Sequence, residues 1–425
     1  MRRCGIPCAA VLSPPLEGLT IATAETIAAP VSSTLAAADT LRPGRMVSLD
    51  VFRGATIAAM ILVNDPGSWS HIYPPLEHAE WNGWTPTDLI FPFFLFIVGV
   101  SLTLSFASRI SRGLTRRALM IHVLRRSALI FAIGLFLNGF PGFDLSSIRI
   151  MGVLQRIALC YLVAGLLYLA TFQREPAAGR TPRVRANLRV TAAVTITLLV
   201  AYWTLMTFVP VPGYGAGHLG KEDNLGAYID RTLMGGHLWS ESVTWDPEGF
   251  LSTLPAIASL LIGILAGEWL RSDQRAGRKV MGLAAAGFVL LAAGQLLHPY
   301  FPINKNLWTS SFVLFTGGFA MLSLAACYWI VDVRAWRAWT PPWLVFGMNA
   351  ILAYALAALV SEISTDFEFL HFHGRETTLH GWIYDKFFVP HFSPVNASLA
   401  FAVFFVLVIY ALLWPFYRGK VFLRV

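Results

Sequence analysis

Residues 64–94 concentrate the side chains of this sequence that can carry acid–base chemistry. His78 stands directly after Glu77 and two positions before Glu80, among aromatic, proline and glycine residues. An imidazole beside carboxylates can be poised as a general base near neutral pH. The alternative is a histidine merely tolerated in a water-exposed loop, because nine of the ten histidines, all except His122, fall in or beside polar loops.

The residues that follow His78 have a structural interpretation as well as a functional one. Thr85 is a candidate N-cap, with Pro86 at the first helical position and Asp88 at the third, where a carboxylate faces the positive end of the helix. Trp81 and Trp84 suit the belt of aromatic residues at a membrane surface. Spacing therefore leaves capping and chemistry open for Asp88.

The elements that position these residues are predicted to be membrane helices. Only 13% of the 425 residues are charged, about half of what a soluble domain carries, and 56% are hydrophobic. The apolar residues form ten runs, each near the ~20 residues that cross a bilayer. They lie at about 46–64, 89–108, 118–139, 151–172, 188–209, 252–270, 280–298, 308–331, 343–361 and 398–416. The predicted fold is an all-α polytopic membrane protein.

Lysine and arginine predict the orientation of these helices. Cations gather in every second connection, at residues 109–117, 173–189, 271–279, 334–337 and 418–424. The alternate connections carry only Arg149, Lys221, Arg231, Lys305, Arg375 and Lys386. Because cytoplasmic loops carry the excess of lysine and arginine, both termini are predicted to be cytoplasmic. The same pattern explains the net charge of +8 without nucleic acid as a partner.

The chain divides into an N-terminal tail, residues 1–43, and a membrane domain, residues 44–425. The tail is rich in Ala, Thr, Ser and Pro without periodicity and is predicted to be disordered. A signal peptide and a start at Met46 are the alternatives. The four cysteines offer no CxxC spacing and no extracytoplasmic pair, and no His-Glu-x-x-His motif is present, so no metal site is predicted.

Several segments together resemble the heparan-alpha-glucosaminide N-acetyltransferase family. They are SLDVFRG at 48–54, VN at 63–64, HAEWNG at 78–83, DLIFPFFLFIVG at 88–99, GVLQR at 152–156, NKNLWT at 304–309 and GMN at 347–349. The resemblance runs in order from about residue 46 to the end. No stretch resembles the N-terminal extracytoplasmic domain and extra first helix of the animal members, so a compact bacterial-type member is expected.

This resemblance implies transfer of an acetyl group from cytoplasmic acetyl-CoA to the amine of an extracytoplasmic amino sugar of the glucosamine type. It matches His78 to the family's active-site histidine and Asn64 to its neighbouring asparagine. The amine must lose a proton before it can attack, and the thioester oxygen needs a donor as it becomes negative. His78 would remove the proton or take the acetyl group itself, Asn64 would donate, and Asp88 would orient the imidazole.

Other polar residues in or near the spans are candidates for binding. Arg53 and Arg156 lie within apolar runs, where charge is expensive, and are expected to contact CoA; Arg53 could instead simply pair with Asp50. Asn349 needs a buried partner and is placed with them. Acceptor binding is expected at Trp81, Asn82, Asn304 and Lys305, with a plain loop as the alternative for the last two.

A secondary transporter for amino sugars is the alternative function. Transporters often show internal repeats and paired broken helices, and inspection of the sequence finds no convincing repeat. The remaining expectations are a bacterial inner membrane as the location, the lipid bilayer as the surroundings and a homodimer as a possible assembly.

Overall fold

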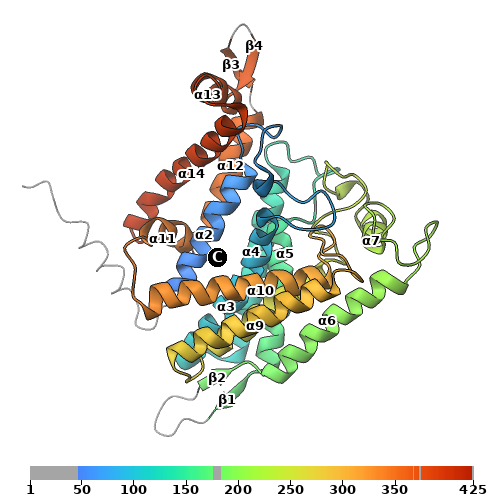
Figure 1. Cartoon of the computed structure of the whole chain (residues 1–425), viewed down its shortest axis with the longest axis vertical. Coiled ribbons are helices and arrows are strands. Elements are labelled where there is room, and N and C mark those ends of the chain that lie inside the picture. Colours follow the sequence, from blue (N-terminus) through green and yellow to red (C-terminus); the bar gives the residue numbers. More distant parts are fainter. Residues whose placement is uncertain (1–45, 176–182, 367, 373–374, 424–425) are drawn as a thin grey trace, which may run out of the picture. The chain divides into compact units, whose positions relative to one another are not determined.

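The structure, a computed structural model, describes residues 46–175, 183–366, 368–372 and 375–423. The predicted tail, residues 1–43, lies outside them. The described chain is mainly helical, with long loops and only short strands (Figure 1). Its long helices are α2 (Val47–Asn64), α3 (Ile90–Ser111), α4 (Arg116–Gly139), α5 (Val153–Thr171), α6 (Leu188–Phe208), α8 (Thr253–Leu270), α9 (Ala276–Leu297), α10 (Ser310–Cys327), α12 (Ala350–Asp366) and α14 (Pro394–Arg418).

Shorter elements fill the connections. They are η1 (Pro74–Leu76), η2 (Pro86–Leu89), α7 (Leu225–Met234), η3 (Gly235–His237), η4 (Tyr328–Val333), α11 (Pro341–Met348) and α13 (Leu379–Phe387). Two antiparallel hairpins pair β1 (Gln173–Glu175) with β2 (Arg183–Arg185), and β3 (Glu368–Phe372) with β4 (Arg375–Thr378). The hairpins were not anticipated, because three to five residues of strand leave little periodicity to read.

The predicted spans are confirmed with one difference. Among the described residues, nine helices are long and apolar enough to cross a membrane, and the count is ten if the bent pair α11 and α12 is one span. The expected single helix over 343–361 is instead broken by an 85° bend between these two helices. Asn349 sits at the break with φ −126° and ψ 45°, outside helical geometry.

Small residues let the central helices approach closely. A Cβ on Gly99 of α3 would lie 2.1 Å from the backbone oxygen of Leu260, and one on Gly263 of α8 would lie 2.1 Å from the oxygen of Phe96. In lipid, where the hydrophobic effect between helices is absent, such backbone proximity supplies the packing energy. The pair α3 and α8 is therefore the centre around which the other helices pack.

The first helix, α2, is held by polar contacts and by a second close crossing. A Cβ on Gly347 of α11 would lie 2.0 Å from the backbone oxygen of Asp50. Arg53 donates to Asp50 Oδ1 at 2.9 Å, to the Gly347 oxygen at 3.1 Å and to Ser101 Oγ of α3 at 2.7 Å. A cation inside an apolar span is thus satisfied by three partners from three helices.

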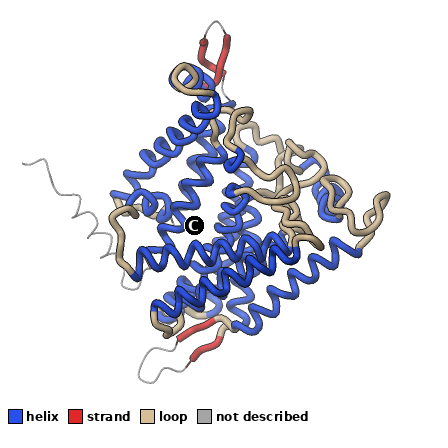
Figure 2. The backbone as a smooth tube through the Cα atoms, viewed as in Figure 1, coloured by secondary structure: helices blue, strands red, loops and turns tan. Residues whose placement is uncertain are grey.

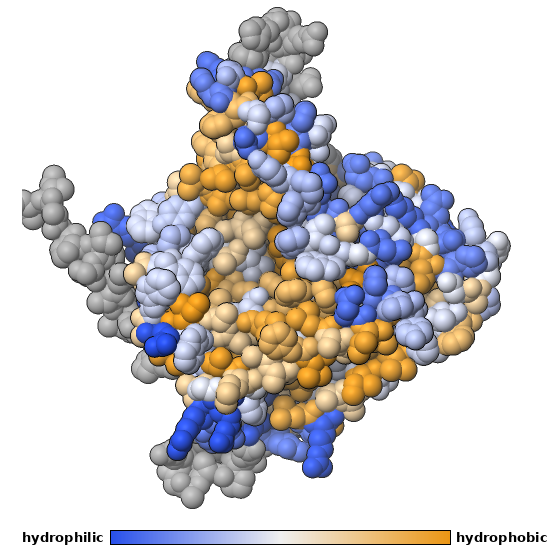
Figure 3. Space-filling view, viewed as in Figure 1, coloured by the Kyte–Doolittle hydropathy of each residue, from blue (hydrophilic) through white to orange (hydrophobic). Residues whose placement is uncertain are grey.

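The outer helices present apolar side chains where lipid is expected. Figure 3 shows an apolar surface over the middle of the molecule and hydrophilic residues toward the loops. Phe288 and Val289 of α9 are more than half exposed, as are Ile196 and Val200 of α6. Such an apolar surface suits hydrocarbon as its solvent.

The connections gather at two ends of the bundle (Figure 2). The end formed by residues 65–89, 140–152, 209–252 and 298–309 is called the loop end here. Its loops contact each other, for example through Gly83 N–H donating to the Ile303 oxygen at 2.8 Å. At the opposite end, Ser48 donates to Asp332, and Arg271 donates to the Val184 oxygen at 2.6 Å. Alternate connections therefore share an end, as the cation pattern requires.

Candidate active site

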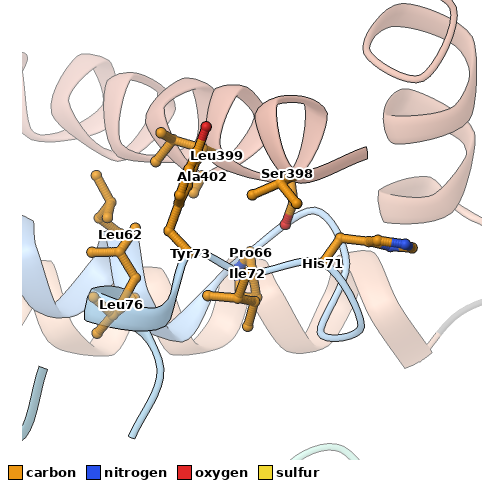
Figure 4. Close-up of a pocket in the computed structure, with 11 residues that line it drawn as sticks. Leu62, Pro66, His71, Ile72, Tyr73, Leu76, Ser398, Leu399 and Ala402 are labelled. Carbon is orange, nitrogen blue, oxygen red and sulfur yellow. The ribbon is translucent and has the colours of Figure 1, made fainter. Parts of the chain in front are cut away.

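The loop that carries His78 is tied down before it reaches that residue. Gly67 N–H donates to the Ser398 backbone oxygen at 3.2 Å, and Ser398 Oγ donates to the Ser68 oxygen at 3.0 Å. The loop and helices α2 and α14 line a small pocket. The Tyr73 side chain points from the loop toward α14, the Ser398 hydroxyl points from α14 toward the loop, and the His71 ring points away (Figure 4). These bonds fix the loop against α14 at the loop end.

Asp88 then binds the loop to the start of α3. Thr85 is the N-cap of η2 as predicted, with Asp88 at the third position. One carboxylate oxygen, Oδ2, accepts from the backbone N–H of Ala79 at 3.1 Å and of Thr85 at 3.0 Å. The other, Oδ1, pairs with His78 Nδ1 at 2.7 Å. The capping interpretation of Asp88 is confirmed, and its contact with His78 leaves the role in chemistry a prediction.

The Asp88 contact fixes the tautomer of His78. The carboxylate is 1% exposed and ionised groups of this kind only accept, so Nδ1 carries the proton and donates it. The other ring nitrogen, Nε2, then presents its lone pair. A buried carboxylate behind an imidazole is the arrangement that orients a general base or nucleophile.

Lys305, from the loop between α9 and α10, completes the group called here the His78 cluster: His78, Asp88 and Lys305. Its Nζ lies 3.1 Å from His78 Nε2, 3.0 Å from Nδ1 and 3.6 Å from Asp88 Oδ1. The amine is thus as close to Nδ1 as to Nε2, and because Nδ1 donates to Asp88, Nε2 is the ring nitrogen left to accept a proton from it. Burial lowers the pKa of Lys305, and the negative Asp88 and Glu248 oppose that shift.

A second set of buried charges lies beside the first and was missed in the sequence. Arg149 donates to Asp246 through two nitrogens at 2.8 and 2.6 Å and to Glu248 at 2.5 Å. Burial alone would raise the pKa of Glu248, but the cations Arg149, Arg156 and Lys305 outweigh it and lower that pKa. These residues are almost a hundred positions apart, so only an acidic pair placed directly before α8 could have signalled them.

Arg156 lies beside the second set, near the charges of Glu248 and Asp246, and is fully buried at 0% exposure. Its Nη2 donates to Ser252 Oγ and to the Gly249 oxygen, and its guanidinium stands 5.1 Å above the Trp308 ring. Within the described chain, its Nε and Nη1 have no hydrogen-bond partner. Buried guanidinium donors are costly when unpaired, so these two nitrogens are suited to an oxygen of a bound molecule.

The predicted acceptor-binding residues lie at the same end but mainly bind the protein itself. Trp81 Nε1 donates to the Leu219 oxygen at 2.8 Å, and its ring meets that of Trp245. Asn304 is fully buried and donates to Asn82 Oδ1 at 3.2 Å. These contacts join three loops around the His78 cluster. The residues would therefore determine the shape of the sugar site more than contact the sugar directly.

Asn64, by contrast, ends α2 with an exposed side chain, and no hydrogen bond joins it to His78 in the described structure. Its amide is therefore available to a ligand.

The residues expected to contact CoA separate into two places. Arg53 lies toward the other end of α2 from Asn64, with eleven residues of helix, about 16 Å, between them, and Asn349 follows Gly347, which contacts α2 near Arg53. Asn349 donates to the Val421 oxygen at 3.1 Å and accepts from Leu423 N–H at 3.1 Å, so its buried partner is the C-terminal segment. Arg156 belongs to the loop end, with the His78 cluster.

The sequence was compared with protein-family models and with known proteins, and the family-model match includes Arg53 and Arg156. Residues 45–180 match the family model described as heparan-alpha-glucosaminide N-acetyltransferase, catalytic. The chain is 33% identical over 353 residues to the human protein named heparan-alpha-glucosaminide N-acetyltransferase, which covers 73% of this chain and 52% of that protein. The mouse protein of the same name is 32% identical over 351 residues, 73% of this chain and 53% of its own length. The chain thus spans about half the length of these relatives.

Proposed function

We propose that this chain is a member of the heparan-alpha-glucosaminide N-acetyltransferase family, whose catalytic model and relatives it matches, and that it transfers an acetyl group from acetyl-CoA to the amine of an amino sugar. The observation that carries the proposal is the 2.7 Å contact between His78 and the buried Asp88, inside the segment that matches the catalytic model. Glucosamine is the simplest acceptor of this class.

His78 is the proposed proton acceptor. An ammonium has no lone pair, so the sugar amine must lose a proton before it attacks the thioester carbon. Asp88 holds the Nδ1 proton, so Nε2 performs the transfer, and the imidazolium that forms is stabilised by the carboxylate. The same nitrogen could take the acetyl group first and pass it on, which is the covalent version of the route.

Asn64 is the proposed donor to the thioester oxygen. Its amide is exposed at the end of α2, where that helix meets the loop of His78. A donor aimed at a developing oxyanion contributes roughly 3 to 4 kcal/mol to such reactions. Arg156, with two unpaired nitrogens, is the proposed contact for a carbonyl oxygen of the pantetheine arm.

Donor and acceptor are proposed to arrive from opposite ends. Acetyl-CoA enters from the cytoplasm at the end of Arg53 and Asn349, with its pantetheine arm extended along α2 toward His78. The helix is 18 residues long, about 27 Å, so the reaction crosses most of the bilayer. The cation-rich connections at that end support a cytoplasmic side, and a bacterial inner membrane is the proposed location.

Purified protein in detergent, given radiolabelled acetyl-CoA and glucosamine, tests the proposal. We expect labelled N-acetylglucosamine from the wild type and a loss of about 10²-fold or more in the His78→Ala variant. His71→Ala is the matched control, because His71 is exposed in the same loop and its ring makes, among the described residues, one hydrogen bond, to Ser68 Oγ at 3.4 Å. Full activity in His78→Ala would remove this residue from the mechanism, and no product with any amino sugar would reject the function.

Label located on His78 itself, in peptides of the denatured protein, would separate the two routes. An acetyl-histidine is expected to hold label in the absence of acceptor and to release it when glucosamine is added. Direct transfer leaves His78 unlabelled throughout.

A further inference from the structure

The amine of Lys305 occupies the position that the proposed chemistry requires of an acceptor amine. It is a primary amine 3.1 Å from His78 Nε2, within the reach of a general base, and its side chain is only 18% exposed. The closest carboxylate oxygen, Asp88 Oδ1, is 3.6 Å away. His78, the proposed base for a sugar amine, is therefore already in contact with an amine of the protein, that of Lys305.

We propose that Lys305 is itself an acetyl acceptor, so that the protein acetylates its own Lys305 when no amino sugar is bound. This inference rests on the proposed function, since it uses the same donor and the same base. It assigns a modification site to the loop between α9 and α10. A group held in place beside the base competes with a diffusing acceptor at a high effective concentration.

The step balances without any further reactant. His78 Nε2 takes one proton from the Lys305 ammonium, and the free amine attacks the carbonyl carbon of acetyl-CoA. The nitrogen–carbon bond forms, the carbon–sulfur bond breaks, and the leaving thiolate takes the second amine proton to become the thiol. The products are an N-acetyl-lysine amide, free CoA and a protonated His78, which returns its proton to solvent.

Lys305 differs from the other four lysines of the chain, Lys221, Lys279, Lys386 and Lys420. Among the described residues it is the lysine that contacts a histidine, and burial lowers its pKa, which enlarges the reactive neutral fraction. Lys221 lies at the same end but is exposed, with its Nζ 6.0 Å above the Trp81 ring. It is the internal reference for acetylation that needs no enzyme.

Acetylation of Lys305 changes the His78 cluster. The amide carries no charge, so Asp88 and Glu248 lose a neighbouring cation, and the added acetyl group occupies space beside Nε2. The modified protein is therefore expected to be inactive toward sugars. The ratio of acetyl-CoA to acceptor then sets the fraction of active protein.

Mass spectrometry of peptides tests the proposal. The full chain in detergent is incubated with acetyl-CoA carrying a ¹³C-labelled acetyl group, without acceptor, and each lysine is followed over time. We expect Lys305 to be labelled at least tenfold faster than Lys221 in the wild type, and excess glucosamine to suppress that label. In His78→Ala, the rate at Lys305 is expected to fall to that of Lys221, while a Lys221→Arg variant labels Lys305 as the wild type does.

Glucosamine acetylation is measured on the same samples, so the two proposals can fail separately. A wild type that acetylates glucosamine but labels Lys305 no faster than Lys221 overturns the inference and leaves the function standing. Equal labelling of Lys305 in wild type and His78→Ala also overturns it. Neither product from the wild type rejects both. As a second readout, preincubation with acetyl-CoA alone should lower the later wild-type rate and leave Lys305→Arg at its own starting rate.

Discussion

Asp88 divides its two oxygens between folding and the proposed chemistry. Oδ2 receives the backbone N–H groups of Ala79 and Thr85, which closes the loop onto the start of α3, and Oδ1 receives the imidazole. The His78 ring is itself nearly half exposed, and besides Asp88 the polar group against it is the Lys305 amine. The position of the reacting nitrogen depends on one buried carboxylate.

An Asp88→Asn variant is expected to keep the fold and lose the reaction. The amide cannot stabilise an imidazolium as a carboxylate does, so we expect kcat to fall by about 10²-fold or more. The control is Thr85→Val, which removes the hydroxyl that contacts Glu77 and Asp88 but keeps the backbone N–H bond to the carboxylate. Equal losses in the two variants would mean that loop capping alone explains the effect.

Asp230 of α7 provides a pH test at the loop end. Burial raises its pKa to about 6, although the Phe250 N–H donates to it at 2.9 Å. Its contribution to folding is fully present below about pH 4 and is lost as pH rises to about 6. The Asp230→Asn variant keeps an acceptor for Phe250 and carries no charge.

We therefore expect this variant to gain stability over the wild type across that window, approaching about 3 kcal/mol above pH 6, since one pKa unit corresponds to about 1.4 kcal/mol. Thermal unfolding in detergent at several pH values measures the difference. A constant gap from pH 4 to pH 7 would contradict the assignment, and Glu222→Gln, an exposed substitution nearby, should leave the stability profile unchanged.

At this scale, the sequence could predict residues that lie near one another in the chain. His78, Asp88 and the Thr85 cap fall within eleven positions, so capping rules and charge proximity indicate them. The contact of Arg149 with Asp246 and Glu248 joins two loops that no periodicity relates. Lys305 was expected from a motif as a sugar contact, and its place against His78 depends on how α9 and α10 bring their loop to α3.

The close crossing of α2 with α11 depends on glycine at position 347. A Cβ on Gly347 would overlap the Asp50 oxygen at 2.0 Å, and that atom belongs to rigid backbone. Gly347→Ala must push the two helices apart and disturb the Arg53 bond to the Gly347 oxygen. We expect a loss of about 1 to 3 kcal/mol in stability, measured by thermal unfolding in detergent.

Gly277→Ala is the matched control for that substitution. It lies in the first turn of α9, is exposed, and has nothing within 4 Å of an added Cβ. Its stability should stay within about 0.5 kcal/mol of the wild type. If Gly347→Ala were equally harmless, the close crossing of α2 with α11 would not contribute to stability.

Hydropathy predicted the helices well because each span depends on its own residues alone. In the bilayer, every backbone group of a span must be hydrogen-bonded within its own helix. The bend at Asn349 could not be read from hydropathy. Residues 341–366 remain apolar on both sides of it, and the groups that satisfy the break come from residues 421–423, more than seventy positions away. Hydrogen bonds between residues so far apart in the chain leave no local pattern in the sequence.

At the scale of the whole molecule, the alternation of loops between two ends predicts how the protein is oriented in the bilayer. Contacts group the connections into two sets, and lysine and arginine dominate one of them. The predicted cytoplasmic side is therefore the end of β1 and β2, and the His78 cluster faces the other side. This orientation can be measured directly.

Single cysteines give that measurement. In a background with the four native cysteines replaced by alanine, Gly142→Cys and Gly277→Cys both place a thiol in open space at opposite ends. In intact cells, a membrane-impermeant maleimide is expected to label position 142 and to label 277 only after permeabilisation. The reverse result would invert the orientation. Labelling of both positions from outside would reject the two-ended arrangement.

The contacts of Arg53 also set an order on biosynthesis. The chain emerges from the ribosome from its N-terminus, so α2 is presented to the membrane long before Gly347 exists, and even Ser101 follows it by almost fifty residues. Until then the guanidinium has Asp50, three residues earlier on the same helix, as a partner. The α2 span can therefore enter the membrane with its charge paired within its own helix, and its contact with Gly347 forms only after residue 347 has been made.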